Sequence, residues 1–147
     1  MIGFITIIMK PIKLFVAAKA CMVNKENKLL LLRESTLYKD GTNVAKYDVP
    51  GGRIEVSEFL EDALKREVFE EAGISVTGAE IFDVQDTFTE KGEEVWHIVR
   101  LFYKVPYSGE KIILSEDHDE YQWVDLHEVK DYPGLIPNLI PVLAKLV

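Results

Sequence analysis

Apolar and polar residues alternate along the chain in blocks that predict strands on both sides of one amphipathic helix. The first two apolar blocks, residues 13–23 (KLFVAAKACMV) and 28–33 (KLLLLR), flank the polar sequence Asn24-Lys25-Glu26-Asn27, which predicts a β-hairpin. In the second block the leucines are continuous rather than alternating with polar residues. This pattern predicts a strand that is buried on both faces.

Further strand-like segments follow the helix. They are residues 75–77, 79–88 and 95–105. Lys91-Gly92 supplies a hairpin turn between the last two of them. Residues 115–124 begin as an acidic loop and end as a short strand. Asp125 and Glu128 have capping-box spacing, which predicts a short helix, and residues 137–147 predict a closing helix with a proline in its first turn.

The central helix is predicted between Ser57 and Gly73. The hydroxyl of Ser57 suits an N-cap, and a glycine suits the left-handed conformation that ends many helices. At about 100° per residue, one side of this helix is apolar, which predicts that it packs against a sheet. The apolar stripe and the row beside it contain Leu60, Ala63, Leu64, Val68 and Ala72.

The continuation of this buried row is acidic, because Glu67, Glu70 and Glu71 follow on the same side of the helix. Carboxylates at this spacing repel one another, and the last turn of a helix disfavours negative charge. Such departures from local preference are expected at functional sites. Clustered carboxylates suit Mg²⁺ or Mn²⁺, and Arg66 can reach Asp62 or Glu70 to orient one of them. The alternative is a solvated acidic face on a surface helix.

Two segments before the helix have features of a binding site. Residues 34–46 form a long stretch of low apolar content, which we interpret either as a lid or binding loop or as a disordered excursion. Gly51 and Gly52 then allow the backbone to approach a phosphate group or a metal ion closely.

Composition limits the classes of function. At 147 residues the chain fits one domain, with residues 1–12 as an N-terminal extension that is either flexible or wrongly assigned to the protein. The net charge of −8 argues against a nucleic-acid partner, and a free nucleotide, itself anionic, needs a cation in order to bind here. The single Cys21 excludes an internal disulfide and indicates a reducing compartment, which we take to be the cytoplasm.

The N-terminus is apolar, but residues 1–9 are too few to span a bilayer and lack the features of a signal peptide, so no membrane partner is expected. We interpret Met9, in the sequence Met9-Lys10-Pro11, as an alternative start of translation. If residues 1–9 are translated, we interpret them as an added edge strand that would serve as the interface of a homodimer.

The segment from residue 52 to residue 74 resembles the signature of the Nudix hydrolase family, G-x5-E-x7-R-E-U-x-E-E-x-G-U, where U is a bulky apolar residue. Every defined position is matched, by Gly52, Glu58, Arg66, Glu67, Val68, Glu70, Glu71, Gly73 and Ile74. With each common residue at roughly one in 15, seven fixed identities coincide by chance on the order of once in 10⁸ windows. The resemblance is therefore specific, although it covers only a small part of the chain.

The resemblance implies an α/β fold of the Nudix type, an α/β/α sandwich in which a mixed β-sheet lies between helices. It also implies divalent-metal-dependent hydrolysis of a nucleoside diphosphate linked to another group, with Mg²⁺ as the cofactor and Mn²⁺ as an alternative. The metal ligands implied by the motif are Gly52, Glu67, Glu70 and Glu71. The implied catalytic residues are Arg66, Glu67 and Glu70, and the residues with structural roles in the motif are Gly51, Glu58 and Gly73.

Residues outside the motif are candidates for further roles. Nudix members often carry an acidic loop before a Trp-Val strand, and the similar segment here makes Glu120 or Asp117 a candidate general base or further metal ligand. The alternative is a solvated acidic turn. Tyr47 resembles the aromatic residue that often precedes the glycines, and Arg33 and Trp96 are further candidate substrate contacts. An aromatic residue in a strand, however, is more often part of the packing.

The resemblance restricts the substrate by elimination. Phe88 and Thr89 stand where family members that favour ADP-ribose often have a proline, and Glu90 and Lys91 stand where dinucleoside polyphosphate hydrolases tend to have a tyrosine. A nucleoside or deoxynucleoside triphosphate, cleaved to a monophosphate and pyrophosphate, is therefore the expected small-molecule substrate. The alternatives are ADP-ribose or another nucleotide sugar, and a domain that senses a nucleotide without cutting it.

Overall fold

The computed structural model describes residues 9–38 and 43–147, and its framework is a mixed sheet of seven strands. The strands are β1 (Ile12–Val23), β2 (Lys28–Glu34), β3 (Tyr47–Asp48), β4 (Gly51–Arg53), β5 (Glu80–Lys91), β6 (Glu94–Pro106) and β7 (His118–Asp125). The helical elements are α1 (Leu60–Ala72), α2 (Ile140–Leu143) and the 3₁₀ turns η1 (Val129–Asp131) and η2 (Pro137–Leu139). The interpretations of residues 1–8, and of the loop at residues 39–42, lie outside the described residues.

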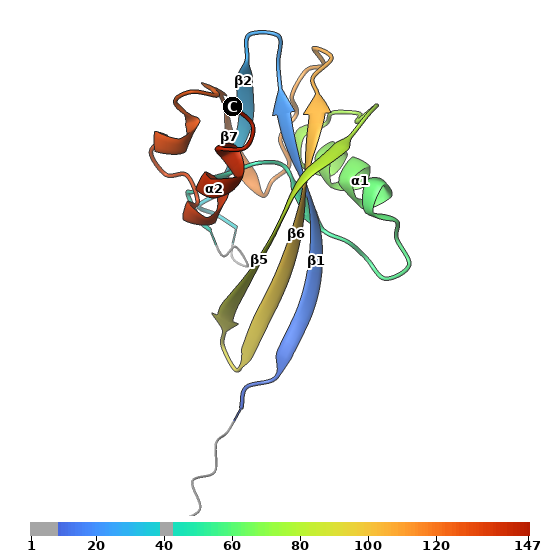
Figure 1. Ribbon diagram of the computed structural model, residues 1–147, viewed down its shortest axis with the longest axis vertical. Coiled ribbons are helices and arrows are strands. Elements are labelled where there is room, and N and C mark those ends of the chain that lie inside the picture. Colours follow the sequence, from blue (N-terminus) through green and yellow to red (C-terminus); the bar gives the residue numbers. More distant parts are fainter. Residues whose placement is uncertain (1–8, 39–42) are drawn as a thin grey trace, which may run out of the picture.

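The sheet divides beyond its first hairpin. β1 pairs in parallel with β6 along its whole length, and β5 adds to β6 in the antiparallel direction. On its other edge β1 meets β2 only where Val23 faces Leu29, whereas it pairs with β4 at residues 17–19. β2 instead pairs with β3 and β7. As a result β1, β5 and β6 form a ribbon that projects from the body of the molecule (Figure 1), and the segment β3–β4 lies where β2 leaves β1.

Helical segments lie on opposite sides of the sheet (Figure 1). α1 buries Leu64, Val68 and Ala72 against one face, while the C-terminal segment with α2 belongs to the core on the other face, together with Phe102. Residues 29–32 of β2 enter these two cores alternately and are at most 1% exposed. The predicted α/β fold with a mixed sheet between helices is confirmed, and so is the burial of β2 on both faces.

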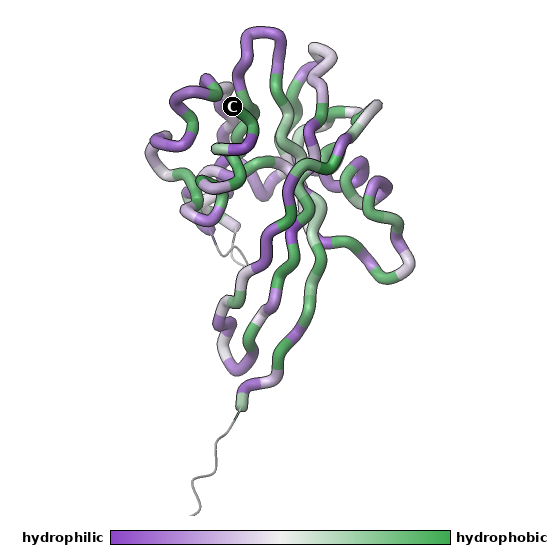
Figure 2. Tube along the Cα trace, in the orientation of Figure 1, coloured by the Kyte–Doolittle hydropathy of each residue, from purple (hydrophilic) through white to green (hydrophobic). Residues whose placement is uncertain are grey.

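The projecting part of the ribbon keeps its apolar pattern, and several of its apolar side chains are exposed in the described part of the chain. Figure 2 shows apolar segments of β1 and β6 running into this part of the molecule, where Leu14 of β1 is 64% exposed and Phe88 of β5 is 63% exposed. α1 covers only the other half of the same face, next to Ala18 and Met22. Strand patterning therefore predicted these strands correctly, but it did not predict how much of each strand is buried.

The predicted hairpins are both present, and Gly92 has the positive φ of 58° that suits the turn between β5 and β6. The prediction of a strand at residues 75–77 is wrong, because this segment has no partner strand in the sheet. Its first backbone N–H, that of Ser75, donates instead to the side chain of Glu110 at 3.2 Å.

The two predicted C-terminal helices are shorter than expected. The side chain of Asp125 accepts a hydrogen bond from the backbone N–H of His127 at 2.8 Å, which forms a local turn instead of a helix cap, and only the 3₁₀ turn η1 follows. Residues 137–147 contain one 3₁₀ turn and the four residues of α2. So short a helix depends on packing for its stability. No helix in the described ranges is both long and apolar enough to cross a membrane.

α1 begins later than predicted. Its N-cap is Phe59, which makes no side-chain capping bond, and Ser57 lies in the preceding loop with a φ of 67°. The side chain of Glu58 closes this loop, because it accepts a hydrogen bond from the backbone N–H of Glu55 at 3.0 Å. The predicted C-terminus is confirmed, since Gly73 has a φ of 69° and donates to the carbonyl of Phe69 at 2.9 Å.

We expect Ser57→Gly to raise the free energy of unfolding by about 0.5 kcal/mol, because glycine removes the cost of a left-handed backbone at an exposed position. Urea denaturation would measure the change. Thr77→Gly, at an exposed position without a positive φ, is the matched control and should lower the same quantity by about 0.5–1 kcal/mol. A loss of stability in Ser57→Gly would instead support the N-cap role.

Candidate active site

Arg66 organises the acidic side of α1. Its Nε and Nη2 atoms donate to the two carboxylate oxygens of Glu58, each at 2.8 Å, and its Nη1 donates to Glu67 at 2.9 Å. The predicted contact with Glu70 is present at 3.4 Å, whereas Asp62, the other predicted partner, is not among the residues that Arg66 bonds in the described structure. The hydrogen bonds from Arg66 lower the pKa of Glu58 to about 2. The guanidinium is therefore held between several carboxylates in a fixed orientation.

The glycine turn of β4 receives two carboxylates of α1. The backbone N–H of Gly51 donates to Glu71 at 2.9 Å. A Cβ on Gly52 would lie 2.6 Å from the carboxylate of Glu67, so any larger residue there would displace this side chain. The glycine turn thus lies against carboxylates of the same chain, and its predicted approach to a phosphate group or a metal ion stays a prediction. Gly51, Gly52, Glu67 and Glu71 are thus in contact across β4 and α1.

Burial disfavours the ionised forms of these carboxylates. Burial raises the pKa of Glu71 to about 8, although Lys19 and the N–H of Gly51 act in the opposite direction. Burial also raises the pKa of Glu67, opposed by its bonds with Arg66. Two neighbouring, partly buried acids of this kind are the environment that a bound cation would stabilise.

A buried ion pair lies beside the glycine turn. Lys19 of β1 is 9% exposed, and its ammonium group lies 2.9 Å from the carboxylate of Asp48 in β3. Burial alone would lower the pKa of Lys19, but Asp48 and Glu71 outweigh that effect and raise it. Sequence reasoning missed both residues. The signal was a lysine in the middle of an otherwise apolar strand, since lysine is almost never buried unless it is paired.

Glu120 belongs to a second group of hydrogen-bonded side chains, apart from those of α1. Its carboxylate accepts a hydrogen bond from the hydroxyl of Tyr47 at 2.6 Å and from the side chain of Gln122 at 2.6 Å, and it pairs with Arg33 at 3.1 Å. Arg33 also bonds Asp119 at 2.7 Å. The structure thus brings together the three candidates Arg33, Tyr47 and Glu120, but it groups them on β2, β3 and β7 rather than with the glutamates of α1.

Trp96 lies on the ribbon, and its indole ring is already in contact with other side chains. The ring meets Phe15 edge to face at 4.9 Å, and the guanidinium of Arg53 lies 5.1 Å from its centroid. Its Nε1–H is buried without a hydrogen-bond partner. Packing explains the ring contacts but not the unpaired N–H, and substrate contact by Trp96 stays a prediction.

The donor set at the glycine turn fits a divalent cation in its chemistry. Glu67, Glu70, Glu71 and the carbonyl of Gly52 are hard oxygen donors of the kind that Mg²⁺ and Mn²⁺ take. Within residues 9–38 and 43–147, however, no three His, Cys, Asp or Glu side chains lie close enough together to hold a metal ion as they stand. The side chain of Glu70 is 57% exposed, so it is the least fixed of these side chains.

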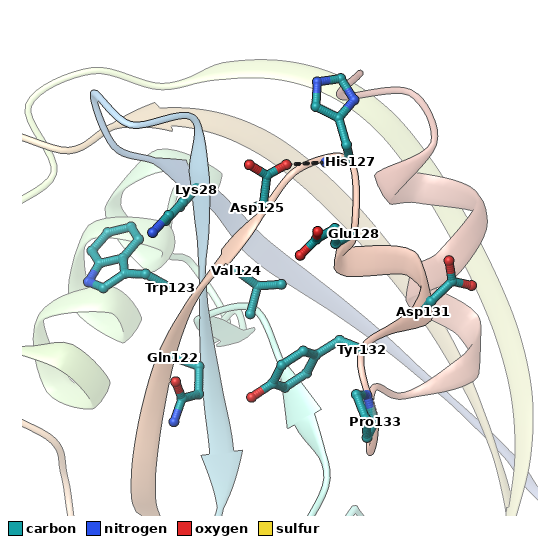
Figure 3. A pocket seen from close by; sticks show the side chains of 10 residues that line it. All are labelled: Lys28, Gln122, Trp123, Val124, Asp125, His127, Glu128, Asp131, Tyr132 and Pro133. Carbon is teal, nitrogen blue, oxygen red and sulfur yellow. Dashed lines mark hydrogen bonds between the residues drawn. The ribbon is translucent and has the colours of Figure 1, made fainter.

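A separate pocket lies at the other end of β2 (Figure 3). It is lined by Lys28, Gln122, Trp123, Val124, Asp125, His127, Glu128, Asp131, Tyr132 and Pro133. A hydrogen bond from the backbone N–H of His127 to the side chain of Asp125 joins two of these residues (Figure 3). None of the predicted site residues lines this pocket, so it gives no support to them.

Comparisons with known proteins place the whole chain rather than its individual site residues. The family model described as NUDIX domain matches residues 13–146. The chain is 25% identical over 99 residues to the nucleoside triphosphatase NudI of Klebsiella pneumoniae, covering 63% of this chain and 70% of that protein. It is 23% identical over 125 residues to the 8-oxo-dGTP diphosphatase of Buchnera aphidicola, covering 80% and 91%. The crystal structure of a MutT protein from Methanosarcina mazei superposes with a TM-score of 0.76 at 28% identity, covering 93% and 94% of the two chains.

Proposed function

The chain belongs to the Nudix hydrolase family, and from this premise we propose that it hydrolyses a nucleoside or deoxynucleoside triphosphate to a monophosphate and pyrophosphate. The observation that carries the proposal is the contact of Glu67 and Glu71 with the glycine turn, next to the arginine that holds Glu67. The names of two relatives, a nucleoside triphosphatase and an 8-oxo-dGTP diphosphatase, support a nucleoside triphosphate as the substrate class.

We assign the metal site to Glu67, Glu70, Glu71 and the carbonyl of Gly52. A bound Mg²⁺ or Mn²⁺ would neutralise phosphate oxygens and activate the attacking water. The chain itself orients the carboxylates of Glu67 and Glu71. Arg66 holds Glu67, and the N–H of Gly51 fixes one oxygen of Glu71 and leaves the other available. Because phosphoryl and nucleotidyl transfer depend mainly on positioning and charge neutralisation, this arrangement supports the reaction.

Glu120 is the proposed general base. Its bonds from Tyr47 and Gln122 lower its pKa, so it is ionised in the physiological pH range. A strongly bonded carboxylate is a weak base, however, and it gains basicity when a ligand displaces one of its donors. Tyr47 and Arg33, which hold Glu120, would then be the side chains that a substrate meets first. We further propose that the protein acts in the cytoplasm, where the buried free thiol of Cys21 stays reduced.

A substrate screen tests the proposal. The purified protein would be incubated with ribonucleoside and deoxynucleoside triphosphates, ADP-ribose, nucleotide sugars and dinucleoside polyphosphates, each with Mg²⁺, with Mn²⁺ or with excess EDTA. We expect a nucleoside monophosphate and pyrophosphate from at least one triphosphate, no product in EDTA, and recovery when Mg²⁺ is returned. Ion-exchange chromatography separates the products.

The screen also separates the alternatives. Cleavage of ADP-ribose or a nucleotide sugar without cleavage of any triphosphate would contradict the proposed substrate class. Binding of a nucleotide without turnover under every metal condition would favour a sensor. Undiminished turnover in EDTA would contradict the metal assignment.

A further inference from the structure

A buried lysine meets the acidic side of α1 at the glycine turn. Among the described residues, Lys19 of β1 is the one charged side chain that the fold buries, with 9% of its surface exposed. It stands opposite Gly51 in the β1–β4 pair. Glu71 reaches the same glycine from α1, because its carboxylate accepts the N–H of Gly51 at 2.9 Å. A lysine so deprived of water is stable only where nearby groups compensate its charge.

Asp48 fixes the position of this lysine. One carboxylate oxygen of Asp48 accepts a hydrogen bond from Nζ of Lys19 at 2.9 Å, and the other accepts one from the backbone N–H of Val49 at 2.7 Å. Both oxygens are therefore engaged, and the carboxylate cannot turn away from the ammonium group. An ammonium group has further N–H bonds to donate, but Asp48 is its hydrogen-bond partner among the described residues. Its charge is thus held in place without being fully shared.

The charge of Lys19 extends to the carboxylates of α1. Burial raises the pKa of Glu71, and Lys19 is the strongest of the influences that oppose this rise, ahead of the N–H of Gly51. Burial also raises the pKa of Glu67, and Lys19 opposes that rise after the stronger effect of Arg66. The fold therefore keeps a positive charge beside two of the carboxylates that we assign to the metal.

Lys19 has opposite effects on these carboxylates and on a cation among them. In the metal-free protein its charge stabilises the partly buried carboxylates, which lack water to do so. The same charge would repel a divalent cation at short range. This repulsion acts whether the carboxylates are ionised or protonated beforehand, because binding of the cation makes the site more positive in either case. Lys19 therefore stabilises the unloaded site and disfavours the loaded one.

We propose that Lys19 is the resident counter-ion of the metal site and that it limits the affinity of this site for a free divalent cation. This inference rests on the metal assignment within the proposed function. Lys19 is a positioning residue here, since its contact is with Asp48. The phosphate groups of a nucleotide carry negative charge that offsets the repulsion. Lys19 thus favours uptake of the metal together with the nucleotide over uptake of the free ion.

Binding of Mn²⁺ in the absence of nucleotide tests this role without turnover. Electron paramagnetic resonance of the free ion, at constant pH and ionic strength, gives the Kd for each variant. We expect Lys19→Met to bind Mn²⁺ about tenfold more tightly than the parent, because the change removes a like charge and keeps a long side chain. Lys19→Arg keeps the charge, and its Kd should stay within about threefold of the parent's.

The sign of the change separates this role from a purely structural one. Lys19→Met leaves Asp48 without its partner, so the temperature of thermal unfolding should fall in either case. A loosened site would bind Mn²⁺ more weakly, whereas the proposal requires tighter binding. A Kd for Lys19→Met that is equal to the parent's or higher would overturn the proposal.

A double variant covers the case in which Lys19→Met does not fold. Lys19→Met combined with Asp48→Asn removes both charges of the pair and keeps an oxygen for the N–H of Val49. Lys19 affects Glu71 more strongly than Asp48 does, so the double variant should still bind Mn²⁺ about threefold more tightly than the parent. If the lysine serves Asp48 alone, the two Kd values should be equal.

Two reference variants complete the experiment. Lys65→Gln removes an exposed cation of α1 and should change the Kd by less than about twofold, because water screens its charge. Glu71→Gln should weaken Mn²⁺ binding about tenfold or more, because it removes a charged ligand. If Glu71→Gln binds as the parent does, the metal assignment fails, and the role of Lys19 fails with it. If Glu71→Gln loses affinity but Lys19→Met gains none, the assignment stands and only the counter-ion proposal falls.

Discussion

Replacing Glu70 by Gln is expected to lower kcat by roughly 100- to 1,000-fold while the protein stays folded, because the amide cannot supply the negative charge that a cation and its phosphate ligands require. This variant tests the charge of Glu70 with little effect on packing. The Glu70 side chain is 57% exposed, and its polar contact is the 3.4 Å approach of Arg66. Removing a like charge near Glu67, at the negative end of the helix, should leave the free energy of unfolding unchanged or raise it by about 0.5 kcal/mol.

Steady-state kinetics on the substrate identified in the screen, together with urea denaturation, would measure both effects. Glu61→Gln, which removes an exposed carboxylate in the first turn of the same helix, is the matched control and should retain the parent's kcat. Parent-like turnover in Glu70→Gln would remove Glu70 from the metal site. Loss of folding together with turnover would show that the residue supports the structure instead.

Replacing Gly51 by Ala is expected to lower the free energy of unfolding by about 3 kcal/mol or more. Gly51 has a φ of +136°, and a Cβ built there would lie 2.2 Å from the carbonyl oxygen of Ala18 and 2.7 Å from the Cα of Lys19. Both atoms belong to the backbone of β1, which is paired on both edges at this point and cannot move without disturbing the sheet. Strain and overpacking therefore act together.

Urea and thermal denaturation would measure this loss. Gly78→Ala is the control, since nothing lies within 4 Å of a Cβ at that position, and its change should stay within about 0.5 kcal/mol. A Gly51→Ala variant with the parent's stability would mean that the glycine turn does not pack against β1 in this way. Where the variant does fold, its turnover should still fall, because the N–H that bonds Glu71 is displaced.

The parts of the fold that follow from local chemistry were predictable. The glycine at the end of α1 and the run of leucines in β2 each have a direct physical meaning that holds without knowledge of distant residues. Ser57 shows the limit of such reasoning. A serine at the start of a helix suits an N-cap, but here Glu58 bonds both the loop and Arg66, so a side-chain network determines where the helix begins.

The parts of the site that depend on distant residues were not predictable. Glu120 is 73 residues from Tyr47 in the sequence, yet their side chains share a hydrogen bond. Lys19 meets Asp48 only because β4 pairs with β1. The partners of an ionisable side chain follow from strand order and register, which hydrophobic patterning does not specify. Motif spacing therefore located the carboxylates and Arg66 of α1, and the family resemblance named Arg33, Tyr47 and Glu120, but neither predicted Lys19 and Asp48 or which side chains bond one another.

The parallel pairing of β1 with β6 has a consequence for synthesis of the chain. β1 leaves the ribosome early, whereas the strand that pairs with its whole length follows only after α1 and β5. Pairings so remote in sequence form slowly, and until β6 emerges one edge of an apolar strand stays open to other chains. Molecules interrupted before β6 are therefore expected to aggregate or to be degraded, and refolding of the complete protein should succeed best at low concentration.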